Sequence, residues 1–248
     1  MVQENNSIQG IFNRIAPVYD QLNDRLSLGQ HRIWKKMAVG WSGAKPGDTA
    51  LDLCCGSGDL ALLLAQQVGA PGQVFGVDFS SCQLDIAQHR PRPFTIPTAQ
   101  ISWLEADVLR LPFADNTFDC ATMGYGLRNV VDIPRSLEEL HRVLKPGAKA
   151  AILDFHRPQG SLLRTFQQWY LQQFVVETAD KFGFREEYAY INPSLDQFPI
   201  GTEQILLAQQ AGFSTATHYP IASGMMGILV ITKGNGQQAT DNRVVPRE

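Results

Sequence analysis

Short apolar runs alternate with amphipathic segments over the first two thirds of the chain. The apolar runs are bounded by glycine, proline or polar residues and predict strands at 49–54, 73–78, 100–105, 118–124 and 149–155. The segments between them have apolar residues at helical spacing and predict helices at 58–69, 80–89 and 134–145. Regular alternation of strands and helices indicates a parallel sheet that is covered on both faces.

The pattern changes after residue 155. Residues 161–192 are rich in aromatic side chains at helical spacing, and 199–211 predicts a further helix. Two closing runs predict strands at 213–221 and 225–232. Five parallel strands, an inserted helical segment and a terminal strand pair make the predicted fold α/β, with a seven-stranded, mostly parallel, Rossmann-like sheet.

The length of 248 residues suits one α/β domain. We expect this domain to span 1–233, with 1–40 forming an N-terminal helical lid and 156–200 forming a helical insertion on the substrate side. The polar, glycine-led segment 234–248 is expected to be a disordered tail.

Composition and charge exclude several classes of protein. The chain is 44% hydrophobic and 18% charged, as ordinary soluble proteins are. A net charge of −3, with no basic run longer than Lys35-Lys36, disfavours nucleic acid as a partner. The four cysteines lack metal-binding spacing, so we expect reduced thiols and no metal site. The N-terminus has no signal-peptide layout, and no apolar run approaches the ~20 residues that span a bilayer. We expect a cytoplasmic protein, and leave peripheral contact with membranes open.

The segment 49–78 carries the clearest chemistry. It consists of an apolar strand, a glycine loop, a helix and a second apolar strand, with Asp52 before the loop and Asp78 at the end of the second strand. The carboxylate of Asp78 can accept hydrogen bonds from both hydroxyls of a ribose, so we expect an adenosine-containing cofactor. The loop is made of small residues that let a ligand approach the backbone, namely Gly56, Ser57 and Gly58.

Two cofactors fit this loop. Gly56, Gly58 and Ala61 satisfy the G-x-G-x-x-G/A pattern of dinucleotide-binding proteins, which taken alone is a weak match. A dinucleotide would place its negative pyrophosphate on the loop and helix N-terminus, close to Asp52 and Asp59. S-adenosylmethionine has no phosphate and carries an ammonium and a sulfonium, so the acidic loop favours it. With the strand layout, this predicts the class I S-adenosylmethionine-dependent methyltransferase fold; a nicotinamide-dependent oxidoreductase is the alternative.

Further cofactor contacts are expected at the carboxyl ends of the other strands, where ligands of open α/β sheets bind. Asp107 can accept a hydrogen bond from the adenine amino group, and Val108 would cover a face of the ring. Phe79 follows the ribose-binding acid, and Gly124 ends the fourth strand, where the backbone passes the cofactor closely. Asp107 could instead be a turn or helix-capping residue. The strand end MGYGLRN lacks the Asn/Asp-Pro-Pro-aromatic cluster of enzymes that methylate amino groups of nucleic acids, which favours another nucleophile.

Four further blocks point to one family. They are YDQLNDRLSLGQHRIWKK at 19–36, GLRNVVD at 126–132, LHRVLKPG at 140–147, and the spaced residues Tyr190, Ser194, Phe198-Pro199 and Ala211-Gly212-Phe213. With the cofactor loop they resemble the ubiquinone/menaquinone biosynthesis C-methyltransferases from Phe12 to about Lys233. The ending SGMMGILVITK departs from the bacterial members and resembles the cyanobacterial and plastid branch, which methylates demethylphylloquinone.

The resemblance implies C-methylation of a prenylated naphthoquinol with S-adenosylmethionine, most directly demethylphylloquinol (2-phytyl-1,4-naphthoquinol) in phylloquinone biosynthesis. Demethylmenaquinol or a benzoquinol precursor of ubiquinone are alternatives, and a non-catalytic adenosylmethionine-binding module is a third reading. The expected partner is therefore a prenylated quinol, and a homodimer is left open.

The chemistry suggests roles for the second and first blocks. A quinone ring is electron-poor, whereas a quinol that has lost a hydroxyl proton can attack a methyl group through its ring carbon. Arg128 could stabilise this phenolate, and Asn129 could orient the ring or a water molecule. Guanidinium stays protonated, so Arg128 is not the base. Proton removal then falls to water or to a neighbour, for which the candidates are Tyr19, Asp20, His31 and Asp154.

Each of these residues has a structural alternative. Arg128 could be a surface residue or a carboxylate-paired residue that holds Asp132, Asp20 could cap a helix, and His31 could be an ordinary partly buried histidine. Residues 162–175 place several apolar side chains along one helical face, which predicts a lid or tunnel for an isoprenoid tail or, alternatively, docking on the sheet. These side chains are Leu162, Phe166, Trp169 or Tyr170, and Phe174.

Overall fold

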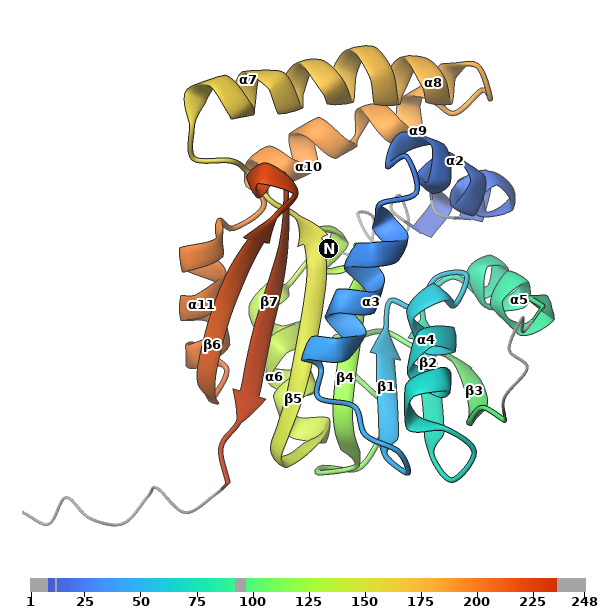
Figure 1. The fold of residues 1–248 in the computed structure, drawn as a ribbon, viewed down its shortest axis with the longest axis vertical. Coiled ribbons are helices and arrows are strands. Elements are labelled where there is room, and N and C mark those ends of the chain that lie inside the picture. Colours follow the sequence, from blue (N-terminus) through green and yellow to red (C-terminus); the bar gives the residue numbers. More distant parts are fainter. Residues whose placement is uncertain (1–8, 12, 92–96, 236–248) are drawn as a thin grey trace, which may run out of the picture.

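The computed structural model of the chain describes residues 9–11, 13–91 and 97–235. Within this part, seven strands form one sheet in the order β3-β2-β1-β4-β5-β7-β6 (Figure 1). Strands β1 to β5 are parallel, whereas β7 runs antiparallel between β5 and β6. The strands are β1 (Thr49–Leu53), β2 (Gln73–Asp78), β3 (Gln100–Glu105), β4 (Phe118–Gly124), β5 (Leu144–Phe155), β6 (Phe213–Ile221) and β7 (Met226–Lys233). Apart from residues 234–235, the predicted tail lies outside the described residues.

Helices cover both faces of the sheet, as the alternating pattern predicts. Helices α3 and α4 pack on one face and α6 and α11 on the other, while α5 lies beside β3 (Figure 1). Their bounds are α3 (His31–Trp41), α4 (Asp59–Val68), α5 (Ser81–His89), α6 (Ile133–Val143) and α11 (Gly201–Gln210).

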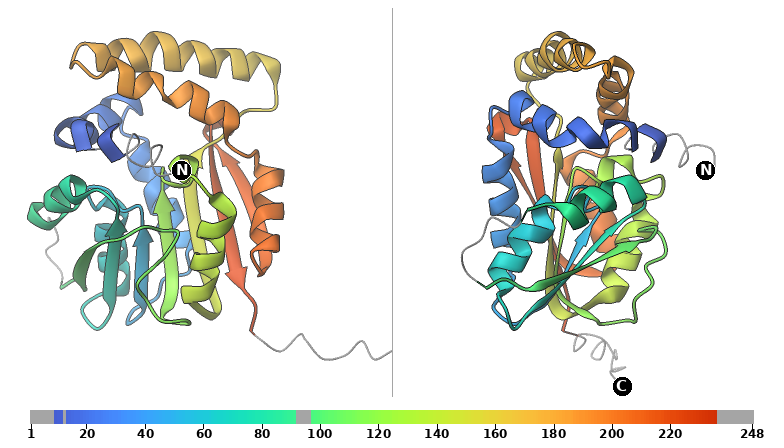
Figure 2. Two further views of the ribbon diagram at one scale, coloured as in Figure 1. Left: turned by 180° about the vertical axis from the view of Figure 1, so that it is seen from behind. Right: turned by 90° about the vertical axis from the view of Figure 1, so that its right-hand side faces the viewer.

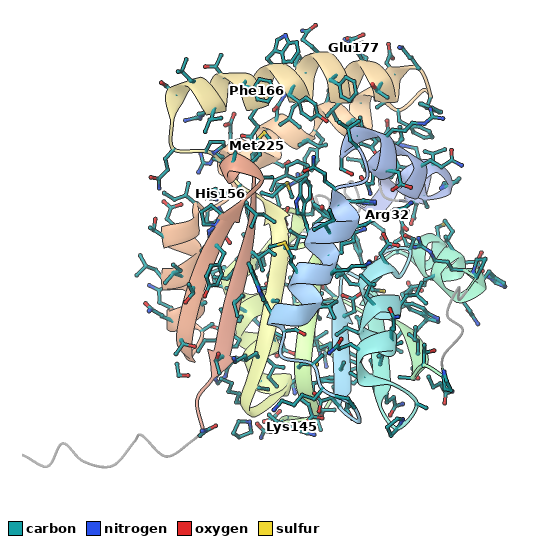
Figure 3. The ribbon with its side chains drawn as sticks, viewed as in Figure 1. Arg32, Lys145, His156, Phe166, Glu177 and Met225 are labelled. Atoms are coloured by element: carbon teal, nitrogen blue, oxygen red, sulfur yellow. The ribbon has the colours of Figure 1, made fainter. Side chains whose placement is uncertain are left out.

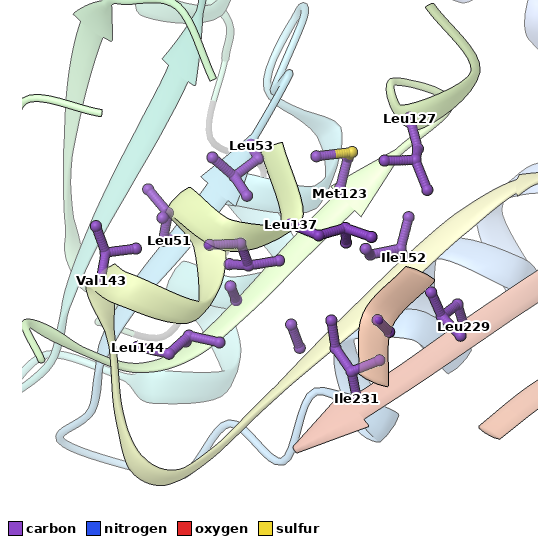
Figure 4. Close-up of a cluster of buried hydrophobic side chains, with 14 of the residues drawn as sticks. Leu51, Leu53, Met123, Leu127, Leu137, Val143, Leu144, Ile152, Leu229 and Ile231 are labelled. Carbon is purple, nitrogen blue, oxygen red and sulfur yellow. The ribbon is translucent and has the colours of Figure 1, made fainter. Parts of the chain in front are cut away.

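Each face has its own hydrophobic core. Between the sheet and α6, alternate strand residues such as Leu51 and Ile152 pack against Leu137 and Leu140 (Figure 4). Each of these four side chains is at most 2% exposed. Burying a leucine or isoleucine contributes about 1.5–3 kcal/mol, so this core fixes how the strand ends line up.

Strand β5 begins five residues before the predicted position 149. Helix α6 ends at Val143, and the chain continues directly into the strand, where buried Leu144 pairs with Phe118. The predicted end of this helix at 145 is therefore wrong by two residues. Pro146 is tolerated in the strand because the register shifts at this point.

A helical layer lies beyond the carboxyl ends of the parallel strands (Figures 1 and 2). It contains the N-terminal helix α2 and the insertion that follows β5. Ile15, Leu22 and Leu26 of the N-terminal segment pack against Leu171 and Val175 of the insertion. The elements are α2 (Tyr19–Leu26), α7 (Ser161–Tyr170), the π-helix η3 (Leu171–Val176), α8 (Glu177–Asp180), α9 (Arg185–Ala189) and α10 (Ile191–Gln197).

The insertion does not dock on a face of the sheet, so that alternative is wrong. Helix α7 leaves most of its predicted apolar face exposed: Leu162 is 86% exposed and Trp169 57%. No described helix is both long and apolar enough to cross a bilayer.

Candidate functional site

Two cavities lie at the carboxyl ends of the parallel strands and share a wall. The strand-end cleft takes in about 670 Å³, open solvent at its mouth included, and lies over the ends of β1 to β4. The apolar cavity takes in about 1470 Å³, again with open solvent included, and lies between the N-terminal helices and the insertion. Tyr125 and Asn129 line both, from the turn after β4 and the short helix η2 (Leu127–Asn129). The two cavities are therefore adjacent at these two residues.

Asp78 is the main polar group of the strand-end cleft. Its side chain lies at the end of β2, where Oδ2 accepts from the Gly56 amide at 2.8 Å and Oδ1 from the Ser80 amide at 2.9 Å. Burial raises the pKa of Asp78, and the amides of Ser80 and Gly56 oppose this shift. Because each carboxylate oxygen has two lone pairs, both can still accept a ribose hydroxyl.

Five other predicted cofactor residues also line the cleft: Gly56, Phe79, Asp107, Val108 and Gly124. Oδ1 of Asp107 accepts from the Leu109 amide at 2.9 Å, so Asp107 also closes a turn, as the structural alternative predicts. A Cβ at Gly124 would lie 2.7 Å from Leu60 Cδ1 of α4, so the Leu60 side chain would have to shift to admit a larger residue here. The apolar lining fits an adenine ring and the Asp78 carboxylate fits its ribose, as S-adenosylmethionine requires.

The glycine loop contributes less to the cleft than the sequence predicts. Gly56 lines it with φ +52°, but Ser57 and Gly58 are not among its described lining residues. The backbone carbonyl and the hydroxyl of buried Ser57 accept from Arg90 Nη1, at 3.0 and 3.2 Å. Gly58 has φ +89°, and a Cβ there would lie 2.6 Å from the ring of Trp103. These two residues shape the loop from behind, and their direct contact with the cofactor stays a prediction.

Asp52 also lies behind the loop rather than in the described lining of the cleft. It is fully buried, and its Oδ1 accepts from Thr122 Oγ1 at 2.7 Å. Burial raises the pKa of Asp52 to about 7, against the hydrogen bond from Thr122. Its neighbour Asp59 is paired with Lys35 and, at 2.6 Å, with Arg90. The predicted repulsion of a pyrophosphate by Asp52 and Asp59 is therefore largely cancelled. The support for the cofactor comes instead from the residues that line the cleft.

The apolar cavity is lined from three directions. Its N-terminal wall includes Ile15 and Leu26, and the insertion adds Phe166, Tyr170 and Leu171. Figure 3 shows Phe166 on α7 above Met225, which precedes β7 and also lines the cavity. The rim is apolar as well, because Leu28 is 78% exposed and Phe166 47%. The cavity can thus hold a large apolar ligand whose tail reaches the surface.

Arg128 lines the apolar cavity and is held by the groups around it. Its amide donates to Asp154 Oδ2 at 3.0 Å, and its Nε lies 3.6 Å from Asp154 Oδ1. Nη1 donates to Ser194 Oγ of α10. Both members of the ion pair have side chains about 5% exposed. Burial raises the pKa of Asp154, and the charge of Arg128 opposes this shift.

These contacts show whether Arg128 is paired with Asp132, as its structural alternative predicts. Asp132 caps α6 by accepting from the Arg135 amide at 3.0 Å, so the expected pairing of Asp132 with Arg128 is wrong. Arg128 is nevertheless paired with a carboxylate, that of Asp154. Asn129 donates from Nδ2 to the Tyr125 carbonyl at 3.0 Å, which ties the shared wall together.

The other predicted catalytic residues lie in the N-terminal helices. His31 is 4% exposed and lines the apolar cavity, and its Nε2 lies 2.8 Å from Asp24 Oδ1. The side chains of Tyr19 and Asp20 lie outside the described part of the chain.

Sequence reasoning missed three contacts around the site. The first is the contact of Asp24 with His31, although their spacing of seven residues across the turn at Gly29 is a usable signal. Lys35 was another: it is 6% exposed and its ammonium lies 5.8 Å from the centroid of the Tyr125 ring. The third is the contact of the N-terminal segment with the loop after β2. Gln9 Nε2 donates to the Phe79 carbonyl at 2.6 Å, and Ser80 Oγ lies 2.5 Å from Asn13 Oδ1.

Comparison with known sequences gives matches over almost the whole chain. A model of the ubiE/COQ5 methyltransferase family matches residues 1–233. A "2-phytyl-1,4-naphtoquinone methyltransferase" from Nostoc punctiforme is 71% identical over 92% of this chain and 99% of that protein. The chloroplastic "2-phytyl-1,4-beta-naphthoquinone methyltransferase" of Arabidopsis thaliana is 52% identical over 93% of this chain and 88% of that protein.

Solved structures show the same fold. A SAM-dependent methyltransferase from Aquifex aeolicus has a TM-score of 0.62 at 18% identity and covers 86% of this chain and 97% of that chain. Another from Thermotoga maritima has a TM-score of 0.61 at 19% identity, over 91% and 99%. At this level of identity the likeness concerns the fold alone, and it confirms the predicted fold class.

Proposed function

The chain belongs to the ubiE/COQ5 methyltransferase family and is an S-adenosylmethionine-dependent methyltransferase, and from this premise we propose that it methylates a ring carbon of 2-phytyl-1,4-naphthoquinol. The product would be the methylated quinol of phylloquinone synthesis. Support for this substrate comes from relatives that carry the corresponding name over nearly the full chain length.

The observation that carries the proposal is the wall shared by the two cavities. Asp78, Phe79, Asp107 and Val108 would hold the adenosine of the cofactor in the strand-end cleft. Bound S-adenosylmethionine supplies an electrophilic methyl group. A quinol in the apolar cavity would meet that methyl at Tyr125 and Asn129, which line both cavities. Holding the two reactants in this geometry replaces a bimolecular encounter and lowers the barrier.

Arg128 would make the quinol reactive. A phenol such as tyrosine has a pKa of about 10, so at neutral pH the phenolate must be stabilised. The Arg128 guanidinium faces the cavity from a largely buried position, where a charge acts more strongly than in water. Its pairing with Asp154 and Ser194 fixes its direction before substrate arrives. Asn129 would orient the ring beside it.

The two ends of the apolar cavity differ in polarity, which would orient the substrate. The polar groups Arg128 and Asn129 lie at its inner end, next to the cofactor cleft. Leu28 and Phe166 belong to its lining and are also exposed, so they mark an outer, apolar end. The quinol ring would bind inside and the phytyl tail would leave between these two residues. In this arrangement the described part of 1–40 would form the lid, and 156–200 would form the insertion of one domain.

The proposal is tested by methyl transfer from labelled S-adenosylmethionine. We expect transfer to reduced 2-phytyl-1,4-naphthoquinol and none to the oxidised quinone, because only the quinol has a nucleophilic ring carbon. A benzoquinol with the same tail tests ring specificity. Transfer to the benzoquinol alone would contradict the proposed substrate, and hydride transfer with NAD would favour the oxidoreductase.

We also propose that the exposed face of α7 and η3 rests on a neutral bilayer, which holds the prenylated substrate. Leu162, Trp169 and Phe174 are exposed on this layer, next to the rim of the apolar cavity. Indole and phenyl rings favour the membrane–water interface. Arg164 pairs with Asp196 nearby, and the polar side of α7 is glutamine-rich, so anionic lipid is not required.

Co-sedimentation with phosphatidylcholine vesicles tests this contact. We expect the chain to bind, and Leu162→Ser combined with Trp169→Ser to weaken binding by about tenfold. Leu206→Ser is the matched control, since Leu206 is 57% exposed on α11, away from this layer. Equal loss in both variants, or binding that needs anionic lipid, would contradict the contact. A cytoplasmic location, a homodimer and the lack of a nucleic-acid partner stay predictions.

A further inference from the structure

A buried histidine–carboxylate pair forms part of the wall of the apolar cavity. His31 begins α3, and Asp24 lies on the last turn of α2, across the turn that joins the two helices. His31 Nε2 lies 2.8 Å from Asp24 Oδ1. Arg32 Nε donates to the same Asp24 oxygen at 2.9 Å, so the carboxylate is fixed from the solvent side. The imidazole itself is 4% exposed.

This pairing determines which nitrogen of His31 carries the proton. Ionised Asp24 can only accept hydrogen bonds, so Nε2 is the protonated nitrogen and Nδ1 holds a lone pair. Nδ1 is buried and has no hydrogen-bond partner among the described residues. A buried lone pair of this kind is costly unless a ligand satisfies it, and His31 lines the cavity that would hold such a ligand.

Other charged groups around the cavity are already engaged. Glu187 lines it, but its Oε1 accepts from Arg14 Nε at 2.8 Å. Arg128 is cationic and cannot take a proton. Asp154, an alternative base in the sequence analysis, is paired with Arg128 and is not among the described lining residues. His31 differs from these groups in having a buried acceptor, Nδ1, that no described residue hydrogen-bonds.

We propose that His31 is the catalytic base that removes the hydroxyl proton of the quinol, with Asp24 as the residue that positions it. This inference rests on the proposed function. The quinol O–H bond breaks and its proton moves to His31 Nδ1. The electron pair left on oxygen moves into the ring, whose carbon bonds to the donor methyl while the methyl–sulfur bond breaks toward sulfur. The methylated carbon then loses its hydrogen as a proton to water, and His31 returns its proton to the ring oxygen.

The electrostatics of the pair suit this role. Burial and the charge of Lys35 lower the pKa of His31, against the raising effect of Asp24 and Asp59, so the imidazole is neutral at pH 7. The hydrogen bond from Arg32 lowers the pKa of Asp24, which keeps the carboxylate ionised. Across the cavity, Arg128 and Glu187 are the charged groups of the described lining, and Arg128 would stabilise the anion that deprotonation creates.

The kinetic test compares wild type with His31→Gln over pH 5 to 10. We expect turnover of the variant at pH 7 to fall about 100-fold, as removal of a general base does. Wild-type turnover should rise with pH up to the lowered pKa of His31 and then level off. Turnover of the variant should keep rising toward the pKa of the quinol, near 10, because solvent must then remove the proton. The proposal would be overturned if turnover of the variant at pH 7 stayed within about threefold of wild type. It would also be overturned if turnover of the variant still levelled off at the pH where wild-type turnover does.

His89→Gln is the matched control. His89 forms a comparable pair with Asp85 at 3.3 Å, but both side chains are about 75% exposed on α5. We expect its turnover and pH profile to match wild type. A wild-type chain that transfers no methyl to any quinol would instead refute the proposed function, whatever the state of His31.

A nuclear magnetic resonance titration of the histidine nitrogens gives a readout that does not depend on activity. We expect His31 to carry its proton on Nε2 and to titrate below pH 6.5. Asp24→Asn should lower the pKa of His31 further, because the carboxylate raises it, and should reduce turnover while cofactor affinity stays the same. A proton on Nδ1 in wild type would overturn the assignment. This measurement uses the wild-type chain, so it decides the question even if His31→Gln fails to fold. Parallel loss of cofactor binding and turnover in Asp24→Asn would show a structural role instead.

Discussion

The strand-end cleft and the apolar cavity share a wall, but they are assembled in different ways. Every described residue of the cleft lining comes from 54–131, which contains β2 to β4 and the loops after the first strands. The apolar cavity draws its lining from 11–34, 125–129, 155–191 and 222–226. One site is thus built by consecutive strand ends, and the other by segments that only the tertiary fold brings together.

The chemistry of the two cavities differs in the same way. Asp78 and backbone amides at strand ends define the cleft, and any chain with this sheet can supply such groups. The apolar cavity depends on α2, α7 and η3, which pack beyond the sheet rather than on its faces. Under the proposed function, the sheet would provide the cofactor site, whereas the added helical segments would determine the substrate.

The largest effect is expected when the positive charge of Arg128 is removed from the apolar cavity while the strand-end cleft is unchanged. An unpaired buried Asp154 would cost about 3–5 kcal/mol, so Arg128→Gln is best made together with Asp154→Asn and compared with Asp154→Asn alone. Turnover should fall about 100- to 1000-fold, because a fixed charge that stabilises the reacting anion is lost. Calorimetry with S-adenosylhomocysteine should give nearly unchanged affinity.

Arg185→Ala serves as the control for this experiment, since Arg185 is exposed and pairs with Glu177 and Asp180 at the surface. Equal losses of turnover and cofactor affinity in the Arg128 variant would refute the separation of roles between the cavities.

Asp78→Asn makes the opposite change, in the cleft alone. One carboxylate oxygen becomes an amide donor that faces the loop amides, and a charged hydrogen bond worth about 1.5–3 kcal/mol is lost. Cofactor affinity should therefore fall about 10- to 100-fold, while turnover at saturating cofactor changes much less. Asp85→Asn, on the exposed face of α5, is the matched control. Unchanged affinity would exclude Asp78 as the ribose-binding residue.

A smaller effect is expected at the outer end of the apolar cavity. Phe166→Ser removes apolar surface that the phytyl tail would contact, so the KM for 2-phytyl-1,4-naphthoquinol in detergent should rise about tenfold. The KM for a tail-less naphthoquinol should stay the same. Leu163→Ser, on the same helix but outside the described cavity lining, should change neither value. A similar rise for both substrates would mean that Phe166 acts on the ring or on folding.

The smallest effect on activity is expected at Asp52, behind the cleft. Asp52→Asn should reduce cofactor affinity less than Asp78→Asn does. Its main effect should be on stability, because burial raises the folded-state pKa of Asp52 from 3.8 to about 7. The folded state then binds the proton more tightly, so this carboxyl costs the wild type stability as pH rises from 4 to 7.

Denaturant unfolding of wild type and Asp52→Asn between pH 4 and 7 measures this effect. The free energy of unfolding of the variant should increase relative to wild type with rising pH, by on the order of a few kcal/mol. A difference that is constant with pH would show that Asp52 is ionised throughout.

Local patterns explain why much of the fold and the cleft could be predicted. Strand ends follow from short apolar runs, and the residue after a parallel strand must lie at the ligand-binding edge, as Asp78 and Asp107 do. The direction of Asp52 follows from side-chain alternation: Leu51 and Leu53 face the core under α6, so Asp52 must point to the opposite face. That alternation was readable in the sequence.

Long-range partners could not be predicted. Arg128 pairs with Ser194 across 66 residues, and the N-terminal segment contacts the Phe79 carbonyl across 70. No periodicity encodes such contacts, because they arise only when separate segments pack together. Asp24 and His31 are closer in sequence, yet their pairing depends on the turn between α2 and α3.

The most direct test of the account is a crystal structure of the chain with S-adenosylhomocysteine and 2-phytyl-1,4-naphthoquinone. The account predicts the ribose on Asp78 in the strand-end cleft, and the naphthoquinone ring in the apolar cavity between Arg128 and His31. The unsubstituted ring carbon should face the sulfur directly, beside the shared wall of Tyr125 and Asn129, with the tail leaving past Phe166. A ring bound outside the apolar cavity, or separated from the sulfur by this wall, would contradict it.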